Sequence, residues 1–452
     1  MLNNNNVYMY RLNSPDYETL NAESSDVSGF LLAQLEEIVA PGDKVVIKPN
    51  WVKESHLYRP NDWEYVITHP AVIKLVLDKV IQILNGKGEI YIIEAPQTDS
   101  DYEEIIRRIR FKELIDELQK KTTVKISYFD LREEQWFYKQ GIIVGRKRLA
   151  GDPNGYVEIN LKNDSEFYGK TNENYYGADY DMEETRQYHN EHDNIYVISK
   201  TVLNADVFIN IPKLKTHKLA GITCCLKNLV GACVIKNSIP HHTLGTPTNG
   251  GDKFPFESSK NNGEDNLKNL ALKLLKWKNP IINYPFIVLK KIAGCFFGSP
   301  QSDVIRNGAW YGNDTIWRAI LDLNKILFYA DKNGKMCVTP QRKYFAVVDG
   351  VIAGEGKGPM APDPKPVGIL LSGTNPVYID TVAATLMGFD FIKIPTLCKA
   401  YTLRNFNLCT CSSDTIKIKD NQLNTQSLVD ITALGRINIF QPHPGWRNHI
   451  EL

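Results

Sequence analysis

Residues 204–231 read NADVFINIPKLKTHKLAGITCCLKNLVG, and this stretch decides the fold. Its apolar run from Val207 to Ile211 is rich in β-formers and ends at Pro212, which predicts a short buried strand. Basic and polar side chains follow, and in open α/β sheets the ligand site lies beyond the carboxyl ends of the strands. We therefore expect a polar, cationic loop at such an edge; an ordinary solvated basic loop is the competing interpretation. The side chains concerned are Lys213, Lys215, Thr216, His217, Lys218, Thr223, Lys227 and Asn228.

Four sequence blocks carry a family resemblance. NIPKLKTH, GITCCLKNLVG, VVDGVIAGEGKGP and GTNPVYIDTVAATLMG, with an early KPN triplet, resemble the bacterial and archaeal family called domain of unknown function 362 (DUF362). The blocks follow the family's order from Val45 to Gly388. The resemblance implies membership and no particular reaction. Many relatives carry a ferredoxin-like CxxCxxC segment that this chain lacks, so we expect no iron–sulfur cluster within it.

Composition describes an ordinary soluble globular chain. Its 452 residues are 43% hydrophobic and 23% charged, and the formal net charge is +1, which excludes a general electrostatic role toward nucleic acid or membranes. The segment Ile281–Gly298 is apolar but too short and interrupted to span a membrane, so we expect no transmembrane segment and interpret this one as a buried helix or a homo-oligomer contact. The N-terminus lacks a secretory signal and the eight cysteines form no CxxC pair, which favours reduced thiols and a cytoplasmic location.

The first third of the chain alternates between strand and helix patterns. DKVVIKPNW and EIYIIEAP predict buried strands, and HPAVIKLVLDKVIQIL between them has helical apolar spacing. This alternation predicts an α/β fold: a mostly parallel open sheet with helices on both faces, plus long mixed insertions.

The same patterns divide the chain into five parts. Residues 132–195 are rich in Asn, Asp, Tyr and Gly and predict a β-rich insertion that forms a lid. The full division is 1–131, a first α/β half; 132–195, the insertion; 196–235, the central strand-loop-helix motif; 236–343, a mainly helical excursion; and 344–452, a second α/β half with the C-terminal tail.

Polar residues also follow the other predicted strands. Because parallel strands end at one edge of a sheet, we expect these side chains to converge with the central motif. They are Lys48, Asn50, Glu94, Asp349 and Glu355.

The leading interpretation is an enzyme for a small anionic metabolite, a carboxylate or a phosphate. His217 is the candidate proton carrier, because the unperturbed pKa of histidine is about 6.5, and Lys213 and Asp349 are its catalytic partners. Lysine ammonium groups hold anions, and amide and hydroxyl groups orient them. The predicted anion-binding residues are Lys48, Asn50, Lys215, Thr223, Lys227 and Asn228.

Two other interpretations stay open. The first is a metal-dependent, redox-capable protein with a divalent or transition metal held by His217, His241 and His242, together with Glu355 or Asp349. The Lys/His motif and the lysine-bearing helix are similar, at fold level alone, to the nickel-cofactor lactate racemases. The second is a non-catalytic binding or scaffold protein that uses the 281–298 segment as its partner face.

Overall fold

The computed structural model describes residues 4–139, 142–178, 182–257, 305–422 and 424–452. The predicted oligomer contact at Ile281–Gly298 lies outside the described residues. No helix within the described ranges is long and apolar enough to cross a bilayer.

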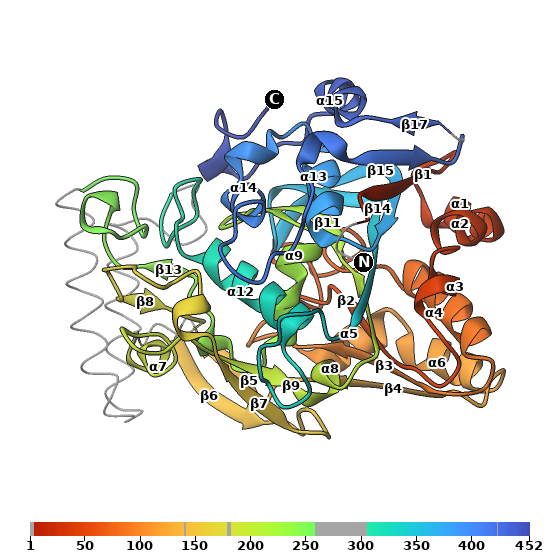
Figure 1. Cartoon of the computed structure of the whole chain (residues 1–452), viewed down its shortest axis with the longest axis horizontal. Helices are drawn as coiled ribbons and strands as arrows, with labels where there is room; N and C mark the ends of the chain where they lie inside the picture. Colours follow the sequence, from red (N-terminus) through yellow and green to blue (C-terminus); the bar gives the residue numbers. More distant parts are fainter. Residues whose placement is uncertain (1–3, 140–141, 179–181, 258–304, 423) are drawn as a thin grey trace.

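One large sheet organises the molecule (Figure 1). Its main path has the strand order β17-β16-β1-β15-β14-β10-β2-β3-β4, and β11 and β12 join it beside β14. The strands β14, β10, β2, β3 and β4 pair in parallel, whereas β15 is antiparallel to both β14 and β1. This confirms the predicted mostly parallel open sheet. The strand bounds are β1 (Asn6–Arg11), β2 (Lys44–Pro49), β3 (Glu89–Glu94), β4 (Lys125–Asp130), β10 (Val207–Ile211), β11 (Lys213–His217), β12 (Gly221–Thr223), β14 (Lys343–Lys357), β15 (Ala361–Gly373), β16 (Lys417–Asp420) and β17 (Thr425–Gln426).

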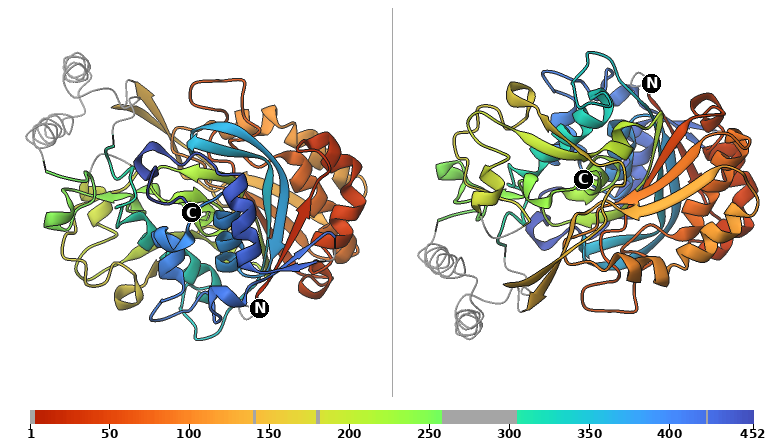
Figure 2. Two further views of the ribbon diagram at one scale, coloured as in Figure 1. Left: turned by 90° about the horizontal axis from the view of Figure 1, so that it is seen from above. Right: turned by 90° about the horizontal axis from the view of Figure 1, so that it is seen from below.

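Helices cover both faces of this sheet, because its central strands are apolar on both sides. On β2, Val45 and Ile47 belong to one core and Val46 to the other. Figure 2 shows the N-terminal helices on one side of the sheet and the later helices on the other. The first group is α1 (Tyr17–Ala22), α2 (Ser24–Leu31), α3 (Leu35–Ile38), α4 (Pro70–Leu84), α5 (Tyr102–Arg108) and α6 (Phe111–Gln119). The second is α8 (Lys200–Leu203), α9 (Cys225–Asn228), α12 (Ile316–Tyr329), α13 (Pro376–Leu386) and α14 (Pro395–Ala400), with α15 (Leu428–Ile437) packed on α13.

The region predicted as a β-rich insertion contains short antiparallel pairs. The strands β5 and β6 pair with each other, β7 pairs with β9, and β8 pairs with β13 from the following region. Its role as a lid stays a prediction. The elements are β5 (Glu134–Lys139), β6 (Ile142–Arg148), β7 (Tyr156–Asn160), β8 (Tyr175–Tyr176), α7 (Met182–Arg186), β9 (Ile195–Ser199) and β13 (His242–Thr243).

The predicted cationic loop is wrong, because this segment is a strand. Residues 213–217 form β11, which pairs in parallel with β14 and antiparallel with β12. The glycine-rich segment after Asp349 continues β14 to Lys357, with an irregular register between Gly350 and Ile352. A side chain at Gly354 would lie 2.9 Å from the carbonyl of Tyr65. Gly354 therefore allows the strand to pack closely against the neighbouring loop, and it does not form a turn.

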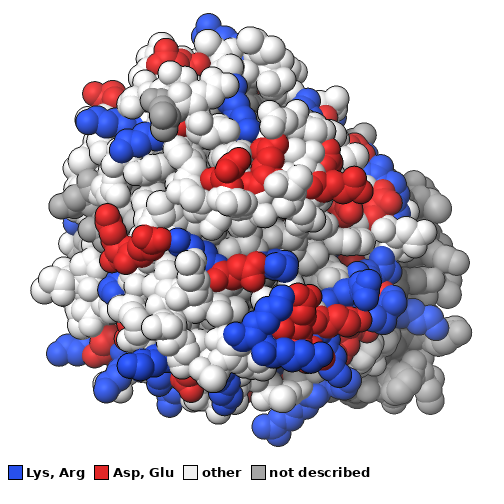
Figure 3. Space-filling view, turned by 90° about the vertical axis from the view of Figure 1, so that its right-hand side faces the viewer, with Lys and Arg blue, Asp and Glu red and all other residues white. Residues whose placement is uncertain are grey.

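Neither acidic nor basic side chains dominate the surface over the N-terminal helices. In Figure 3 acidic and basic side chains are interspersed across this face. This fits the net charge of +1 and leaves local basic groupings to be sought inside the molecule.

Candidate functional site

A first polar network lies where β2 and β3 end, and we call it the Lys48 network: Lys48, Asn50, Glu94, Asn210 and Asn228. The Lys48 ammonium lies 2.9 Å from the Glu94 carboxylate, with side-chain exposures of 0% and 2%. The Asn228 amide oxygen accepts hydrogen bonds from Lys48 (3.2 Å) and Asn50 (2.8 Å), and its nitrogen donates to Asn210 (2.7 Å). The charge of Lys48 is therefore neutralised within the protein.

A second network surrounds Lys213 on β11, and we call it the Lys213 network: Tyr17, His69, Lys213 and Asp349. The Lys213 ammonium lies 3.0 Å from the Asp349 carboxylate and donates to the Tyr17 hydroxyl at 2.5 Å. Asp349 also accepts from the Tyr17 hydroxyl (3.0 Å) and from the backbone N–H of His69 (2.9 Å). Burial raises the pKa of Tyr17 well above its ordinary value, so the phenol stays protonated. Lys213 and Asp349, both predicted as catalytic residues, thus neutralise each other's charge.

A third grouping differs from both networks because its cations lack carboxylate partners. Lys215 is fully buried, and its ammonium donates only to the backbone carbonyl of Val66 among the contacts of the described residues. In the antiparallel register of β11 and β12, Lys215 lies opposite Thr223 and His217 lies opposite Gly221. Side chains at alternate positions and at paired positions share a face, so Lys215, His217 and Thr223 point to the same side of this hairpin.

Electrostatics places further basic groups beside this hairpin. After burial, the charge of Lys227 is the largest influence that lowers the pKa of His217 and of His241, and Lys218 acts on both histidines in the same direction. Lys213 and then Lys227 lower the pKa of Lys215 beyond the effect of burial. We call Lys215, His217, Lys218, Lys227 and His241 the basic cluster. In the part of the chain that the structure describes, no carboxylate forms an ion pair with any of them.

Lys218 and Lys227 border the hairpin, and burial lowers the pKa of both although both keep some exposure to solvent. Lys218 is exposed and Lys227 is partly exposed. Burial nevertheless lowers the pKa of Lys218, and burial with the charges of Lys236 and Lys48 lowers the pKa of Lys227 to about 7.

His217 is held in one tautomer. Its Nδ1 accepts the backbone N–H groups of Leu219 (3.0 Å) and Ala220 (3.2 Å), so Nδ1 carries no hydrogen. Burial lowers its pKa well below the ordinary value, and the neutral ring must then carry its hydrogen on Nε2. His217 is therefore arranged as a neutral N–H donor, in contrast to the proton carrier expected from its residue type.

One polar atom beside the cluster has no partner. The Thr223 hydroxyl is buried, with 3% of the residue exposed, and makes no hydrogen bond to any described residue. A buried hydroxyl without a partner costs on the order of 1–3 kcal/mol. Its position opposite Lys215 makes it a donor that a bound anion would satisfy.

The predicted metal ligands do not gather. His241 Nδ1 lies 2.7 Å from the carbonyl of Ile239, and the His242 ring stacks on Tyr176. The Glu355 carboxylate accepts the backbone N–H of Gln441 and lies 3.5 Å from the ammonium of Lys365. Across the described ranges, these histidines and Glu355 form no group of three ligand atoms within 4.8 Å, so the metal site stays a prediction.

The one such group in the described residues consists of Cys224, Cys225 and Asp380. Asp380 accepts the backbone N–H groups of Cys225 (2.8 Å) and Leu226 (2.9 Å), so its carboxylate caps the start of α9. Burial raises the pKa of the Cys225 thiol to about 11. We therefore assign these residues a structural role in positioning α9.

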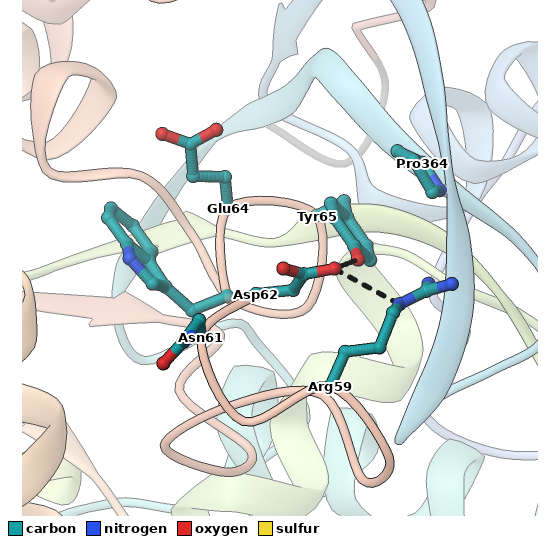
Figure 4. Close-up of a pocket in the computed structure, with 7 residues that line it drawn as sticks. Arg59, Asn61, Asp62, Glu64, Tyr65 and Pro364 are labelled. Atoms are coloured by element: carbon teal, nitrogen blue, oxygen red, sulfur yellow. Dashed lines mark hydrogen bonds and ion pairs between the residues drawn. The ribbon is translucent and has the colours of Figure 1, made fainter.

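A surface pocket of about 310 Å³ lies beside the site, on the loop between β2 and α4 (Figure 4). Asp62 lies between the hydroxyl of Tyr65 and the guanidinium of Arg59, and Arg59 also pairs with Asp363. The next residue after Tyr65 is Val66, whose carbonyl accepts from Lys215. This loop is thus internally paired on its pocket side, and it contacts the basic cluster through the Val66 carbonyl.

Sequence reasoning missed the residues that complete these networks from distant positions. Tyr17 lies 196 positions before Lys213, and Lys236 acts on Lys227 only through its charge. No spacing signal links such pairs, because folding alone brings them together. Lys218 was visible in the motif, but its residue type alone did not separate it from a solvated lysine.

An open, mostly parallel sheet with helices on both faces places the protein in the α/β class. The sequence profile described as Domain of unknown function (DUF362) matches residues 45–140 and 145–385. The chain therefore belongs to the DUF362 family. No curated protein matches it.

Two solved structures show a distant similarity. One is a protein from Thermotoga maritima, with 11% identity and a TM-score of 0.31, covering 79% of this chain and 55% of that one. The other is the lactate racemase apoprotein from Thermoanaerobacterium thermosaccharolyticum, with 11% identity and a TM-score of 0.31, covering 81% and 54%. The chain thus spans about half the length of each. At these scores, neither structure bears on its activity.

Proposed function

We propose that the protein is an enzyme that binds a small anionic metabolite, a carboxylate or a phosphate, at the basic cluster. The observation that carries this proposal is the contrast in charge pairing. Lys48 and Lys213 have buried carboxylate partners, whereas the lysines of the basic cluster have none among the described residues. Lys215 is the fully buried lysine of the cluster, and a buried cation is expected to be paired, so an anion from outside is its natural partner.

The groups around the cluster suit different parts of such a ligand. Lys215 and Lys227 supply positive charge, and Thr223 and the His217 Nε2–H group supply directional donors. The Lys48 ammonium and the Asn50 amide nitrogen both donate to Asn228, so we assign these three residues a positioning role for α9 rather than direct anion contact. Lys213 and Asp349 are left out of the binding site for the same reason.

A direct test is mass spectrometry of the small molecules released from freshly purified protein. We expect a carboxylate or phosphate compound from the wild type and at least a tenfold lower amount from Lys215→Met and Lys227→Met. Each released compound is then returned to the wild type, and its conversion is followed by mass spectrometry.

A lysine outside the cluster provides the matched control. Lys365 pairs with Glu355, so Lys365→Met should release the same amount as the wild type. Equal release from all variants would remove the anion site. Selective release without conversion would leave a binding protein rather than an enzyme.

A further inference from the structure

Lys227 is held on a rigid turn. Its helix α9 is fixed at the start by the two hydrogen bonds to Asp380, and the following residue, Asn228, is tied to β2 and β10. Figure 1 shows α9 between the central sheet and α12, and it contacts both β10 and α12. The Lys227 side chain therefore starts from a backbone with little freedom, as a reactive group requires.

Two lysines whose charges act on Lys227 are occupied, and Lys227 is not. The Lys48 ammonium pairs with Glu94, and the Lys236 ammonium donates to the carbonyls of Val230 and Cys233, both at 3.1 Å. No hydrogen bond or ion pair engages the Lys227 amine among the described residues. Burial and the charges of Lys236 and Lys48 lower its pKa to about 7, so this amine carries a free lone pair at neutral pH far more often than an ordinary lysine does.

We propose that Lys227 is a nucleophile that forms an imine with a small 2-oxo acid, whose carboxylate is held by Lys215, Thr223 and the His217 N–H group. This inference rests on the proposed anion site and adds the substrate class and a catalytic residue. The helix α9 follows β12 directly and contacts it, so Lys227 lies four residues after Thr223. An unpaired amine this close to an anion-binding group matches a ligand that carries a carbonyl next to a carboxylate.

The step balances without any further reactant. The neutral Nζ attacks the carbonyl carbon, a C–N bond forms, and the carbonyl π electrons move to oxygen. The two hydrogens of the amine leave with that oxygen as one molecule of water, and the carbon–nitrogen double bond replaces the carbon–oxygen double bond. No oxidant or reductant takes part, and the imine is hydrolysed by the reverse step.

Borohydride trapping tests the proposal on the full-length protein. Pyruvate and sodium cyanoborohydride are added at neutral pH, and peptides are mapped by mass spectrometry. We expect a single reduced pyruvate adduct on Lys227, formed at least about tenfold faster than on other lysines, because ordinary lysines are almost fully protonated at this pH. Lys227→Arg should lose the adduct, and Lys236→Arg, which keeps the neighbouring charge, should retain it.

Two further measurements keep the test decisive. Inorganic phosphate cannot form an imine, and it should slow labelling of Lys227 in the wild type even if the Lys227 variant folds poorly. Lactate carries a hydroxyl group in place of the 2-oxo group of pyruvate, so it should raise the midpoint temperature of unfolding without forming an adduct. If lactate or phosphate stabilises the protein and Lys227 is not labelled, the imine inference is wrong and the anion site stands. If neither anion binds and Lys227 is not labelled, both proposals are overturned.

Discussion

Lys213 and Lys215 lie two residues apart on the same strand, and the protein treats them in opposite ways. Lys213 has a carboxylate at 3.0 Å and a phenol at 2.5 Å, whereas Lys215 has only a backbone carbonyl. Both side chains are fully buried. The charge of Lys213 is therefore used within the fold, whereas Lys215 remains available for a ligand. The two residues are of the same type and lie on the same strand, so the sequence alone does not distinguish them.

The largest effect is expected from breaking a completed pair. Asp349→Asn removes the carboxylate from Lys213 and leaves a buried charge without compensation. We expect a loss of about 3–5 kcal/mol in the free energy of unfolding, because the remaining ion is still desolvated. Urea denaturation measures it.

A double variant provides the control for this pair. Lys213→Met combined with Asp349→Leu removes both charges and should recover much of the lost stability. If Asp349→Asn is as stable as the wild type, the Lys213 network is not a structural pair and the comparison fails.

Among the described residues Lys227 has no carboxylate partner, so we expect its replacement to stabilise the protein, whereas Asp349→Asn should destabilise it. Burial lowers the pKa of Lys227 from 10.5 to about 7, so between these pH values the folded state binds fewer protons than the unfolded state. Stability due to this group therefore rises with pH across that window and is lowest below pH 7. We expect Lys227→Met to stabilise the ligand-free protein by about 1–2 kcal/mol at pH 6, a value reduced for partial exposure, and less at pH 9.

Urea denaturation of both proteins at pH 6 and pH 9 measures this difference. Lys365→Met should show no such pH dependence, because Lys365 lies outside the basic cluster. A Lys227→Met variant that is less stable than the wild type at pH 6 contradicts the assignment of Lys227 as an unpaired cation.

Two substitutions at His217 separate the contribution of its side chain to stability from its contribution to ligand binding. Asn places an acceptor near the position of Nδ1, so His217→Asn should keep the backbone bonds to Leu219 and Ala220 and lose the Nε2–H donor. We expect less than about 1 kcal/mol of lost stability and about a tenfold loss of phosphate affinity, the worth of one hydrogen bond to an ion.

His217→Ala removes both functions and should cost about 1–2 kcal/mol as well as affinity. Isothermal titration with phosphate and urea denaturation separate the two effects. Equal phosphate affinity in His217→Asn and the wild type would show that the Nε2–H group does not face the ligand.

The sequence predicted the parts of this comparison that are local. The strand Val207–Ile211 was predicted from its apolar β-formers, and the helix Pro70–Leu84 was predicted from its helical apolar spacing. Lys215, Thr223 and Lys227 were predicted anion ligands, and that role stays a proposal. The convergence of Asp349 with the central motif was expected from the strand ends. The contact of Lys213 with Tyr17 was not predictable, because Tyr17 reaches it from a remote helix.

The smallest effect is expected at Glu355, the third carboxylate predicted for the site. It accepts the backbone N–H of Gln441 and lies 3.5 Å from Lys365, which is 29% exposed. An ion pair of this length near the surface contributes about 0–1 kcal/mol and is screened by salt. Glu355→Gln keeps an acceptor for Gln441, so we expect little change in stability and less than a twofold change in phosphate affinity by isothermal titration. A large loss of phosphate affinity in Glu355→Gln would place this carboxylate within reach of the ligand and would end the division between paired and unpaired groups on which the proposed site depends.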